Sequence, residues 1–232
     1  MRVGLVIALL AISLFGPPRV SGDKKDQEGQ TEPHSPRELL RQLQRAIRHE
    51  DKKAYLECFW DKDEQMRQII EASFDAGISA LKFRQALIDS YGADAWEKYA
   101  NAQVKMGFNV GVPSLEPEWV DKVRIRQEAD GRAWVTLTKY ARPSLMIKRD
   151  RVWRFGTKQA LPPKAKPEKI AEFMRVMLGI LNEGRKFAKE AALTIPALKA
   201  KLGQRFFEEI RKLAREAREK AQKGKEIEPD SK

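Results

Sequence analysis

Arginine, tryptophan and threonine alternate with apolar residues along two neighbouring segments in the middle of the chain. The polar positions are Arg124 and Arg126 in the first segment and Trp134, Thr136 and Thr138 in the second. A guanidinium group binds anions and lies over aromatic rings, and an indole offers a flat apolar surface on which a ligand can stack. These residue types indicate either a binding surface for an anion or a base, or cross-strand packing that involves no ligand.

The turn between the two segments decides which side chains share a face. Asp-Gly between alternating runs is typical of a β-hairpin, because glycine adopts positive φ without a steric clash. A two-residue loop would pair Ile125 with Thr136 and mix apolar and polar faces. A three-residue loop, 129–131, pairs Ile125 with Val135 and keeps the faces separate. We therefore predict the three-residue loop, with Gly131 in the left-handed region.

In this register Arg126 lies opposite Trp134, which allows a cation–π contact. The candidate ligand-binding residues are Arg124, Arg126, Trp134 and Thr136. More positive charge is expected nearby, from Lys148, Arg149, Arg151 and Arg154.

A second hairpin is predicted directly after the first. Leu145, Met146 and Ile147 lead into a turn at Arg149-Asp150, which is followed by Val152-Trp153-Arg154-Phe155. Both faces of this pair carry apolar side chains, so each face should be covered. The two hairpins predict a short antiparallel meander of three or four strands, too small to be stable without helices.

Helical patterns precede and follow the meander. Ser35-Pro36-Arg37-Glu38 predicts a helix start in which Ser35 is the N-cap and Glu38 closes a capping box. Helices are also predicted after Asp51, from the acidic segment 61–64 to Tyr91, and at 94–102. Two long helices follow the meander, and Thr194 caps the second. The predicted fold class is α+β: N-terminal helices packed on a short curved antiparallel meander, followed by a long C-terminal helical hairpin.

The first residues have the pattern of a secretory signal peptide. Arg2 precedes an apolar run at 3–15, and Val20-Ser21-Gly22 is a small-residue cleavage site. The run is shorter than the roughly 20 residues that a membrane span needs, and no other segment is long and apolar enough. We predict export to the periplasm or the extracellular space, with an uncleaved anchor as the alternative. The predicted organisation is a signal peptide at 1–22, a disordered leader at 23–35, an α+β domain at 36–156, a linker at 157–167, a helical pair at 168–223 and a disordered tail at 224–232.

The chain is strongly basic, and this charge limits the classes of partner. Its net charge of +12 falls to +10 when the signal peptide removes Arg2 and Arg19. Such a charge favours anionic partners, including envelope polymers. The alternative is a well-solvated surface, since the basic residues are mixed with glutamates along the helices.

Few residues are candidates for catalysis. His34 lies in the leader and His49 at a helix end, whereas Asp75 and Asp89 lie in a long helix. The sequence lacks the motifs of zinc hydrolases, serine hydrolases and phosphate-binding loops, so we predict neither a metal nor another cofactor. The acids at 61–64 fit the start of a helix better than a calcium loop. Cys58 is the only cysteine, and its apolar neighbours predict a buried, inert thiol.

The order of elements from Pro36 to Gly156 resembles that of nuclear-transport-factor-two-like domains. The segment 41–59, with His49-Glu50-Asp51 between two helices, looks like their opening, and Val152-Trp153-Arg154-Phe155 resembles their closing strand. The resemblance extends to uncharacterised exported bacterial proteins that append helices to such a domain. It implies a curved sheet that wraps a helix to form a cone. Members of the superfamily include polyketide-cyclase-like and isomerase-like enzymes, which often place an Asp–His pair in the cone, and non-catalytic binding and dimerisation domains.

Three functional hypotheses follow from these observations. The first is an exported, non-catalytic module that binds a small apolar or anionic ligand or a protein partner, and that forms a homodimer through its sheet. The second is a binder of anionic envelope polymers, in which the basic surface supplies the affinity. The third is an acid/base enzyme, which needs a buried carboxylate with a raised pKa beside a pocket. Nucleic acid is the least favoured anionic partner.

Overall fold

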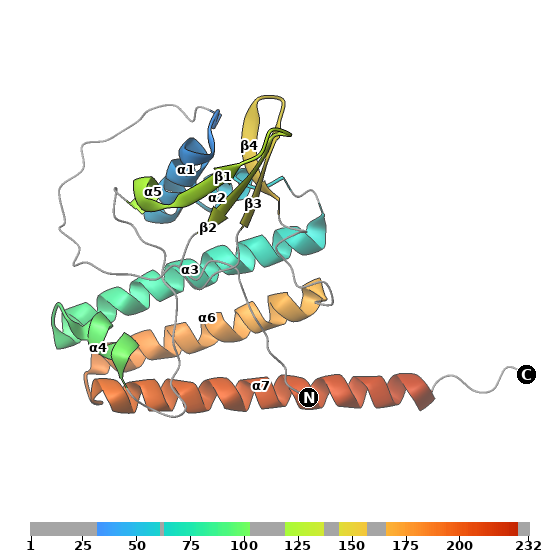
Figure 1. Ribbon diagram of the computed structural model, residues 1–232. Coiled ribbons are helices and arrows are strands. Elements are labelled where there is room, and N and C mark those ends of the chain that lie inside the picture. Colours follow the sequence, from blue (N-terminus) through green and yellow to red (C-terminus); the bar gives the residue numbers. More distant parts are fainter. Residues whose placement is uncertain (1–31, 61–62, 103–118, 137–143, 157–165, 227–232) are drawn as a thin grey trace, which may run out of the picture. The chain divides into compact units, whose positions relative to one another are not determined.

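The computed structural model describes residues 32–60, 63–102, 119–136, 144–156 and 166–226. Within these residues the chain is α+β, with N-terminal helices, a four-stranded antiparallel meander and then C-terminal helices (Figure 1). The predicted fold class is confirmed. The predicted signal peptide, most of the leader and most of the linker lie outside the described residues, as does Thr138.

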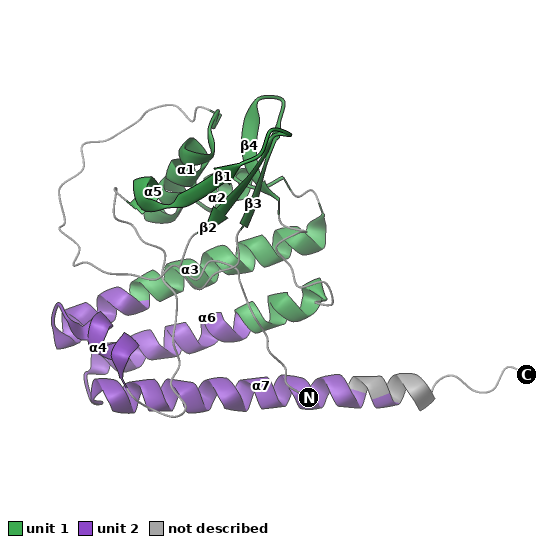
Figure 2. Ribbon diagram, in the orientation of Figure 1, with its two compact units in different colours: residues 1–82, 110–174 green, residues 83–109, 175–232 purple. Residues whose placement is uncertain are grey.

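The described chain forms two compact units, and each unit combines separate stretches of sequence (Figure 2). Unit 1 contains residues 1–82 and 110–174, and unit 2 contains residues 83–109 and 175–232. Helices α3 (Glu64–Tyr91) and α6 (Pro167–Glu190) each contribute to both units. The domain ranges predicted from the sequence stay a prediction.

Helices α1 (Pro36–Arg48) and α2 (Lys52–Glu57) begin where the sequence predicts. The hydroxyl of Ser35 accepts the backbone N–H of Glu38, and the carboxylate of Glu38 accepts the N–H of Ser35, both at 3.2 Å. Asp51 accepts the N–H of Ala54 at 2.9 Å. Each cap satisfies an N–H group that lacks a partner within its helix, and such a cap stabilises by about 1 kcal/mol.

The four strands follow one another in space as they do in the sequence. They are β1 (Arg124–Gln127), β2 (Arg132–Thr136), β3 (Ser144–Arg149) and β4 (Val152–Gly156), in the order β1-β2-β3-β4. A four-residue helix that the sequence analysis did not predict, α5 (Trp119–Lys122), directly precedes β1. The meander itself is as predicted.

The second hairpin turns one residue later than predicted. Arg149 pairs with Val152, so the turn consists of Asp150 and Arg151 rather than Arg149 and Asp150. Both turn residues have positive φ, 49° and 69°, which is the conformation that matches the twist of the flanking strands. Arginine is an uncommon residue at positive φ, and for this reason turn chemistry did not locate the second position.

One face of the sheet, here called the inner face, forms the core of unit 1 together with α1, α2 and α3. Its buried residues are Ala133, Val135, Met146, Trp153 and Phe155. The helices contribute leucines and an aromatic group in which the rings of Tyr55 and Phe74 lie 5.0 Å apart. Burying each such large side chain contributes about 1.5–3 kcal/mol, so this cluster dominates the stability of the unit.

The β4 edge of the sheet is paired. The N–H of Phe155 donates to the carbonyl of Cys58 at 2.8 Å, and the N–H of Trp60 donates to the carbonyl of Phe155 at 3.0 Å. The N–H of Trp153 donates to the carbonyl of Pro33 at 3.0 Å. These contacts satisfy backbone groups that an edge strand would otherwise expose.

The first turns of α6 pack against the first half of α3 within unit 1. The buried residues of this contact are Met66, Ile69, Ala76, Ile170, Ala171 and Met174. Here the C-terminal segment of the chain covers an apolar stripe of α3, and the stripe is part of the core.

Unit 2 contains α4 (Ala95–Asn101), α7 (Ile195–Glu226) and the remaining parts of α3 and α6. Phe83 contacts Tyr99 edge-on, with ring centroids 5.3 Å apart. Helices α6 and α7 form the predicted hairpin, and the hydroxyl of Thr194 accepts the N–H of Ala197 at 3.4 Å. Helix α6 ends at Glu190, and the next residue, Ala191, has positive φ (50°). Helix α7 extends to Glu226, into the predicted tail.

Lys199 is a buried lysine in unit 2, with 3% of its surface exposed. Its ammonium group donates to the carbonyls of Ala100 and Ala102 at 3.1 and 3.0 Å, at the C-terminal end of α4. A cation at this end complements the partial negative charge of the helix terminus. Burial lowers the pKa of the Lys199 ammonium.

Among the helices of the described residues, none combines the length and the apolar character required to cross a membrane.

Candidate functional site

The predicted hairpin register is confirmed. Ile125 pairs with Val135 and Arg126 with Trp134. The N–H of Glu128 donates to the carbonyl of Arg132 at 2.8 Å, and this bond closes a loop of three residues. Gly131 has φ of 77°, where a side chain would be strained.

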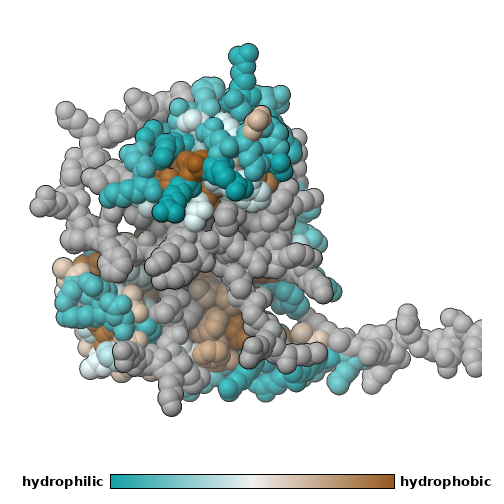
Figure 3. Space-filling model, in the orientation of Figure 1, coloured by the Kyte–Doolittle hydropathy of each residue, from teal (hydrophilic) through white to brown (hydrophobic). Residues whose placement is uncertain are grey.

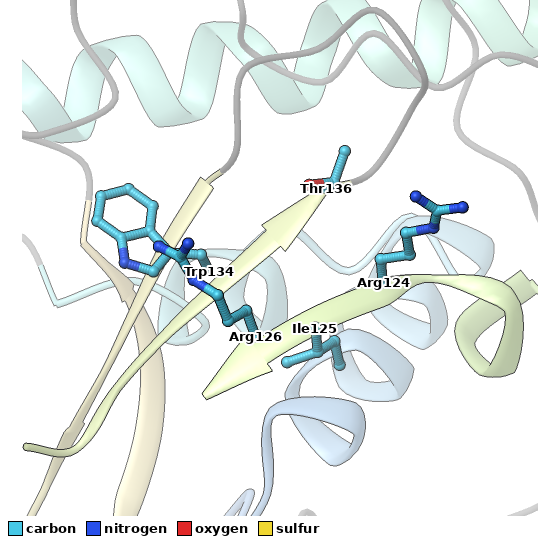
Figure 4. Close-up of a pocket in the computed structure, with 5 residues that line it drawn as sticks. All are labelled: Arg124, Ile125, Arg126, Trp134 and Thr136. Carbon is cyan, nitrogen blue, oxygen red and sulfur yellow. The ribbon is translucent and has the colours of Figure 1, made fainter. Parts of the chain in front are cut away.

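The four candidate residues lie together on the face of the sheet opposite the core, here called the outer face. Arg124 and Thr136 project on one side of the hairpin and Ile125 on the other (Figure 4). A surface hollow of ≈ 420 Å³ is lined by Arg124, Ile125, Arg126, Trp134 and Thr136. The structure thus brings all four candidates to one hollow, and their role as ligand-binding residues stays a prediction.

Glu128 contacts the candidate residues and was not among those selected from the sequence. One of its carboxylate oxygens accepts the indole N–H of Trp134 at 3.1 Å and lies 3.4 Å from the guanidinium of Arg126. The other oxygen lies 3.3 Å from the guanidinium of Arg132. The carboxylate of Glu128 therefore links Arg126 and Trp134, because it contacts both side chains. The available signal was the register, which places position 128 on the same face as Arg126.

Because of Glu128, the two arginines of the hollow differ in whether their charge is already paired. Arg126 shares a carboxylate, whereas among the described residues no carboxylate lies within ion-pair distance of Arg124. Arg124 is thus the cation of the hollow whose charge is available to an anion.

The positive charge extends across the whole outer face. Alternation along the strands places five arginines there, namely Arg124, Arg126, Arg132, Arg149 and Arg154. Lys148 lies opposite Trp153 and therefore on the inner side, and Arg151 lies in the turn. Of the four basic residues expected to enlarge the field, two share the face.

Trp60 lies on the outer face beside β3 and β4. The guanidinium groups of Arg154 and Arg149 lie 4.6 and 5.3 Å from the centre of its ring, and its indole N–H donates to the carbonyl of Ile147 at 2.9 Å. Trp60 thus packs against the guanidinium groups and the backbone of the second hairpin.

The candidates for acid/base chemistry lie apart from one another on the surface. His34, His49 and Asp89 are exposed. A carboxylate oxygen of Asp75 forms an ion pair with Lys52 at 2.7 Å. Among the described residues, the buried polar side chains are those of Gln44, Ser73, Ser79 and Lys199, and none of them is a carboxylate.

Cys58 is completely buried, and its thiol donates to the carbonyl of Ala54 at 3.4 Å. Burial raises the pKa of the Cys58 thiol to about 12, despite the positive charge of Arg154 nearby. A thiol that stays protonated and enclosed is a poor nucleophile. The described residues contain no group of three or more His, Cys, Asp or Glu side chains arranged to hold a metal ion.

Asp63 acts at the start of α3, as the acidic pattern of 61–64 suggests. Its carboxylate accepts the N–H of Gln65 at 3.0 Å, and its carbonyl accepts the N–H of Arg67 at 2.9 Å. Residues 61 and 62 lie outside the described part of the chain.

In the view of Figure 3, one small hydrophobic area is surrounded by hydrophilic residues, and other hydrophobic areas, one of them larger, are visible elsewhere. Comparison of the chain with family models, with curated proteins and with solved structures found no match.

Proposed function

We propose that this chain is an exported, non-catalytic binding protein whose outer face binds a small anionic ligand with a flat or apolar part. The observation that supports this proposal is the hollow of ≈ 420 Å³, which gathers two guanidinium groups, an indole and a hydroxyl. A guanidinium binds a carboxylate or phosphate through two parallel hydrogen bonds, and the indole receives the flat part of the ligand.

Preorganisation strengthens the argument. Glu128 holds the ring of Trp134 through the indole N–H, so ligand binding does not have to order this ring. Arg124, which lacks a carboxylate partner among the described residues, supplies the larger part of the anion affinity. A hydrogen bond to a charged group contributes about 1.5–3 kcal/mol.

Export, the family and a dimer belong to the same proposal. Export is supported by the charged, apolar and small-residue segments within residues 1–22. Membership of the nuclear-transport-factor-two-like superfamily is supported by the order of elements, with two N-terminal helices and a meander that ends in the aromatic strand β4. A homodimer through the sheet is proposed on the resemblance alone.

Two measurements test the binding proposal. Native mass spectrometry of the chain from residue 23, purified at low salt, detects any co-purified ligand. Isothermal titration with 1-naphthyl phosphate then compares the wild type with Arg124→Gln. We expect Arg124→Gln to weaken binding roughly tenfold, because one charge-assisted contact is lost.

The matched control is Arg211→Gln, which removes the same charge from an exposed position on α7. We expect a change smaller than about twofold at physiological salt, because Arg211 does not line the hollow and salt screens exposed charges that do not contact the ligand. Equal losses in the two variants would contradict a localised site.

The five arginines of the outer face also support a second candidate, the binding of an anionic polymer. In that case inorganic polyphosphate binds the wild type, and its affinity falls steeply with salt because counterions are released on binding. The single substitution Arg124→Gln then has a small effect, since the affinity is spread over many charges.

A further inference from the structure

The two edges of the sheet differ. The β4 edge is paired with the backbone of residues 58–60 and with Pro33. At the opposite edge, no described residue pairs with the side of β1 that faces away from β2. The hydrogen bond from the N–H of Glu128 to the carbonyl of Arg132 shows which backbone groups of β1 point towards β2. Hydrogen-bonded positions alternate along an antiparallel strand, so Arg124 and Arg126 bond to β2, and the N–H and C=O groups of Ile125 and Gln127 point away from the sheet.

A hollow lies on each side of this edge. The outer-face hollow includes Ile125, whose side chain belongs to the other face, so this hollow reaches the edge itself. A second hollow of ≈ 390 Å³ is lined by Ser35, Pro36, Arg37, Ile125 and Gln127. Unpaired backbone groups with a side-chain hollow on each side are the arrangement that an added strand uses. Its main chain supplies affinity, and its alternating side chains supply specificity.

The charges on the two sides identify the chemistry of such a strand. Arg124 and Arg126 line the outer hollow, so the residues of an added strand that face them should be acidic. The inner hollow is lined by Pro36 and Ile125 together with Ser35, Arg37 and Gln127, and the guanidinium of Arg37 is bonded to the carbonyl of Val120. The alternate residues should therefore be small, with their apolar contact made to Pro36 and Ile125.

A second copy of the chain is the other occupant to consider at this edge, and dimer formation is one outcome of the test below. The antiparallel self-pairing that joins Ile125 of one copy to Gln127 of the other uses both edge residues. It also places Arg126 directly opposite Arg126 of the second copy, and like charges directly opposite one another are destabilising.

The geometry points to a peptide-binding edge: an extended protein segment with alternating acidic and small apolar residues adds to β1 as a fifth strand. This inference rests on the proposed role of Arg124 and Arg126 in binding anions. It goes further because it names a protein partner and gives the backbone of Ile125 and Gln127 a role.

The test uses the wild-type chain from residue 23 and three forms of one peptide, acetyl-Glu-Val-Glu-Val-Glu-Val-amide. In antiparallel pairing the valine N–H groups face β1 and the glutamate N–H groups face solvent. The second peptide is N-methylated at its valines and the third at its glutamates. We expect the unmodified and glutamate-methylated peptides to bind alike. The valine-methylated peptide should bind at least roughly tenfold more weakly, because it loses two or more backbone hydrogen bonds.

Variants of Gln127 give the corresponding test on the protein side. Proline is tolerated at an edge position whose N–H faces away from the sheet. Gln127→Pro should therefore weaken peptide binding while 1-naphthyl phosphate binds as before. Gln127→Ala keeps the backbone N–H and should weaken peptide binding less than Gln127→Pro does. Thermal unfolding confirms that both variants remain folded.

Several outcomes would overturn the inference. They are equal affinity for the two methylated peptides, no binding of the unmodified peptide, or a concentration-dependent dimer whose formation abolishes peptide binding. If 1-naphthyl phosphate still binds and is weakened by Arg124→Gln in those cases, only the peptide inference fails. If that ligand also fails to bind, the proposed anion site fails as well.

Discussion

The carboxylate of Glu128 contacts three side chains of the first hairpin, the indole of Trp134 and the guanidinium groups of Arg126 and Arg132. It therefore acts in two ways on the same hollow. It fixes the orientation of the ring, and it competes with any external anion for Arg126. The balance between these effects can be measured, because glutamine keeps the oxygen acceptor and removes the charge.

We predict that Glu128→Gln raises the affinity for 1-naphthyl phosphate by roughly threefold to tenfold. The substitution frees the charge of Arg126 while the amide oxygen still accepts the indole N–H. Isothermal titration at physiological salt measures the change. Glu128→Leu, which also removes the acceptor, is the control and should gain less. A loss of affinity in Glu128→Gln would show that the carboxylate helps to bind the ligand.

Cys58 predicts an alkaline limit to stability. Burial raises the pKa of its thiol from the ordinary value of 9.0 to about 12 in the folded chain. Because the folded-state pKa is raised, the stabilisation is complete below pH 9 and is lost as the pH rises from about 9 towards 12. Each pH unit above 9 lowers the free energy of unfolding by about 1.4 kcal/mol, until the pH reaches the folded-state pKa.

The matching experiment compares urea unfolding of the wild type and Cys58→Ala at pH 7.5 and pH 10. The variant is less stable at pH 7.5, by about 1–2 kcal/mol, because a buried group is removed. The difference in the free energy of unfolding between the two proteins should be smaller at pH 10, because only the wild type loses the stabilisation that the neutral thiol provides. The buried phenols of Tyr55 and Tyr99, whose pKa values are also raised by burial, are present in both proteins. If the difference in the free energy of unfolding is the same at both pH values, the pKa of the Cys58 thiol is not raised.

Two glycines of α6 lie in different surroundings. A Cβ at Gly184 would lie 2.9 Å from a methyl carbon of Leu202 and 3.0 Å from the ring of Phe83. A Cβ at Gly179 would have no atom within 4 Å. The helices of unit 2 thus approach closely at one glycine and not at the other.

We expect Gly179→Ala to stabilise the chain by up to about 1 kcal/mol, because alanine favours the helix more than glycine does. Gly184→Ala gains the same helix propensity, but overpacking costs about 1–3 kcal/mol, so the net effect should be destabilising. Thermal unfolding of both variants decides the question. A stabilised Gly184→Ala would show that Leu202 moves aside at little cost.

Local patterns predicted most of the elements. The capping residues Ser35, Asp51 and Thr194 and the left-handed Gly131 are confirmed because each acts within a few residues of its own position. The outer-face hairpin was equally predictable, since its register follows from hydrophobic alternation. The contact between Glu128 and Trp134 was missed because side-chain partners depend on rotamers, which no sequence period encodes.

The two units do not follow the order of the sequence. Met66 and Ile69 of α3 are covered by Ile170 and Met174 of α6, about a hundred residues later in the chain. Hydrophobic periodicity identifies both stripes but gives no information on which pairs with which. The pairing of α3 with α6 could not be predicted for this reason.

This pairing predicts that residues 32–156 alone are less stable than the full chain. The fragment exposes Met66 and Ile69, and each buried large apolar side chain contributes about 1.5–3 kcal/mol. We expect a lower unfolding temperature and stronger binding of an anilinonaphthalene sulfonate dye. A fragment of residues 32–182 retains the first turns of α6 and should recover part of the difference. If the shorter fragment unfolds like the full chain, residues 36–156 are a self-sufficient domain.

The ammonium group of Lys199 is enclosed, so the rate at which this residue is chemically labelled should report on local opening of the fold. Acylating reagents react with a neutral amine that solvent reaches, and Lys199 exposes only 3% of its surface. Its lowered pKa would favour reaction, but the carbonyls of Ala100 and Ala102 hold the amine inside the fold. Lys201, on the same helix, is exposed and should react first. The delay between the two, followed by mass spectrometry, would measure how often α7 opens at the end of α4.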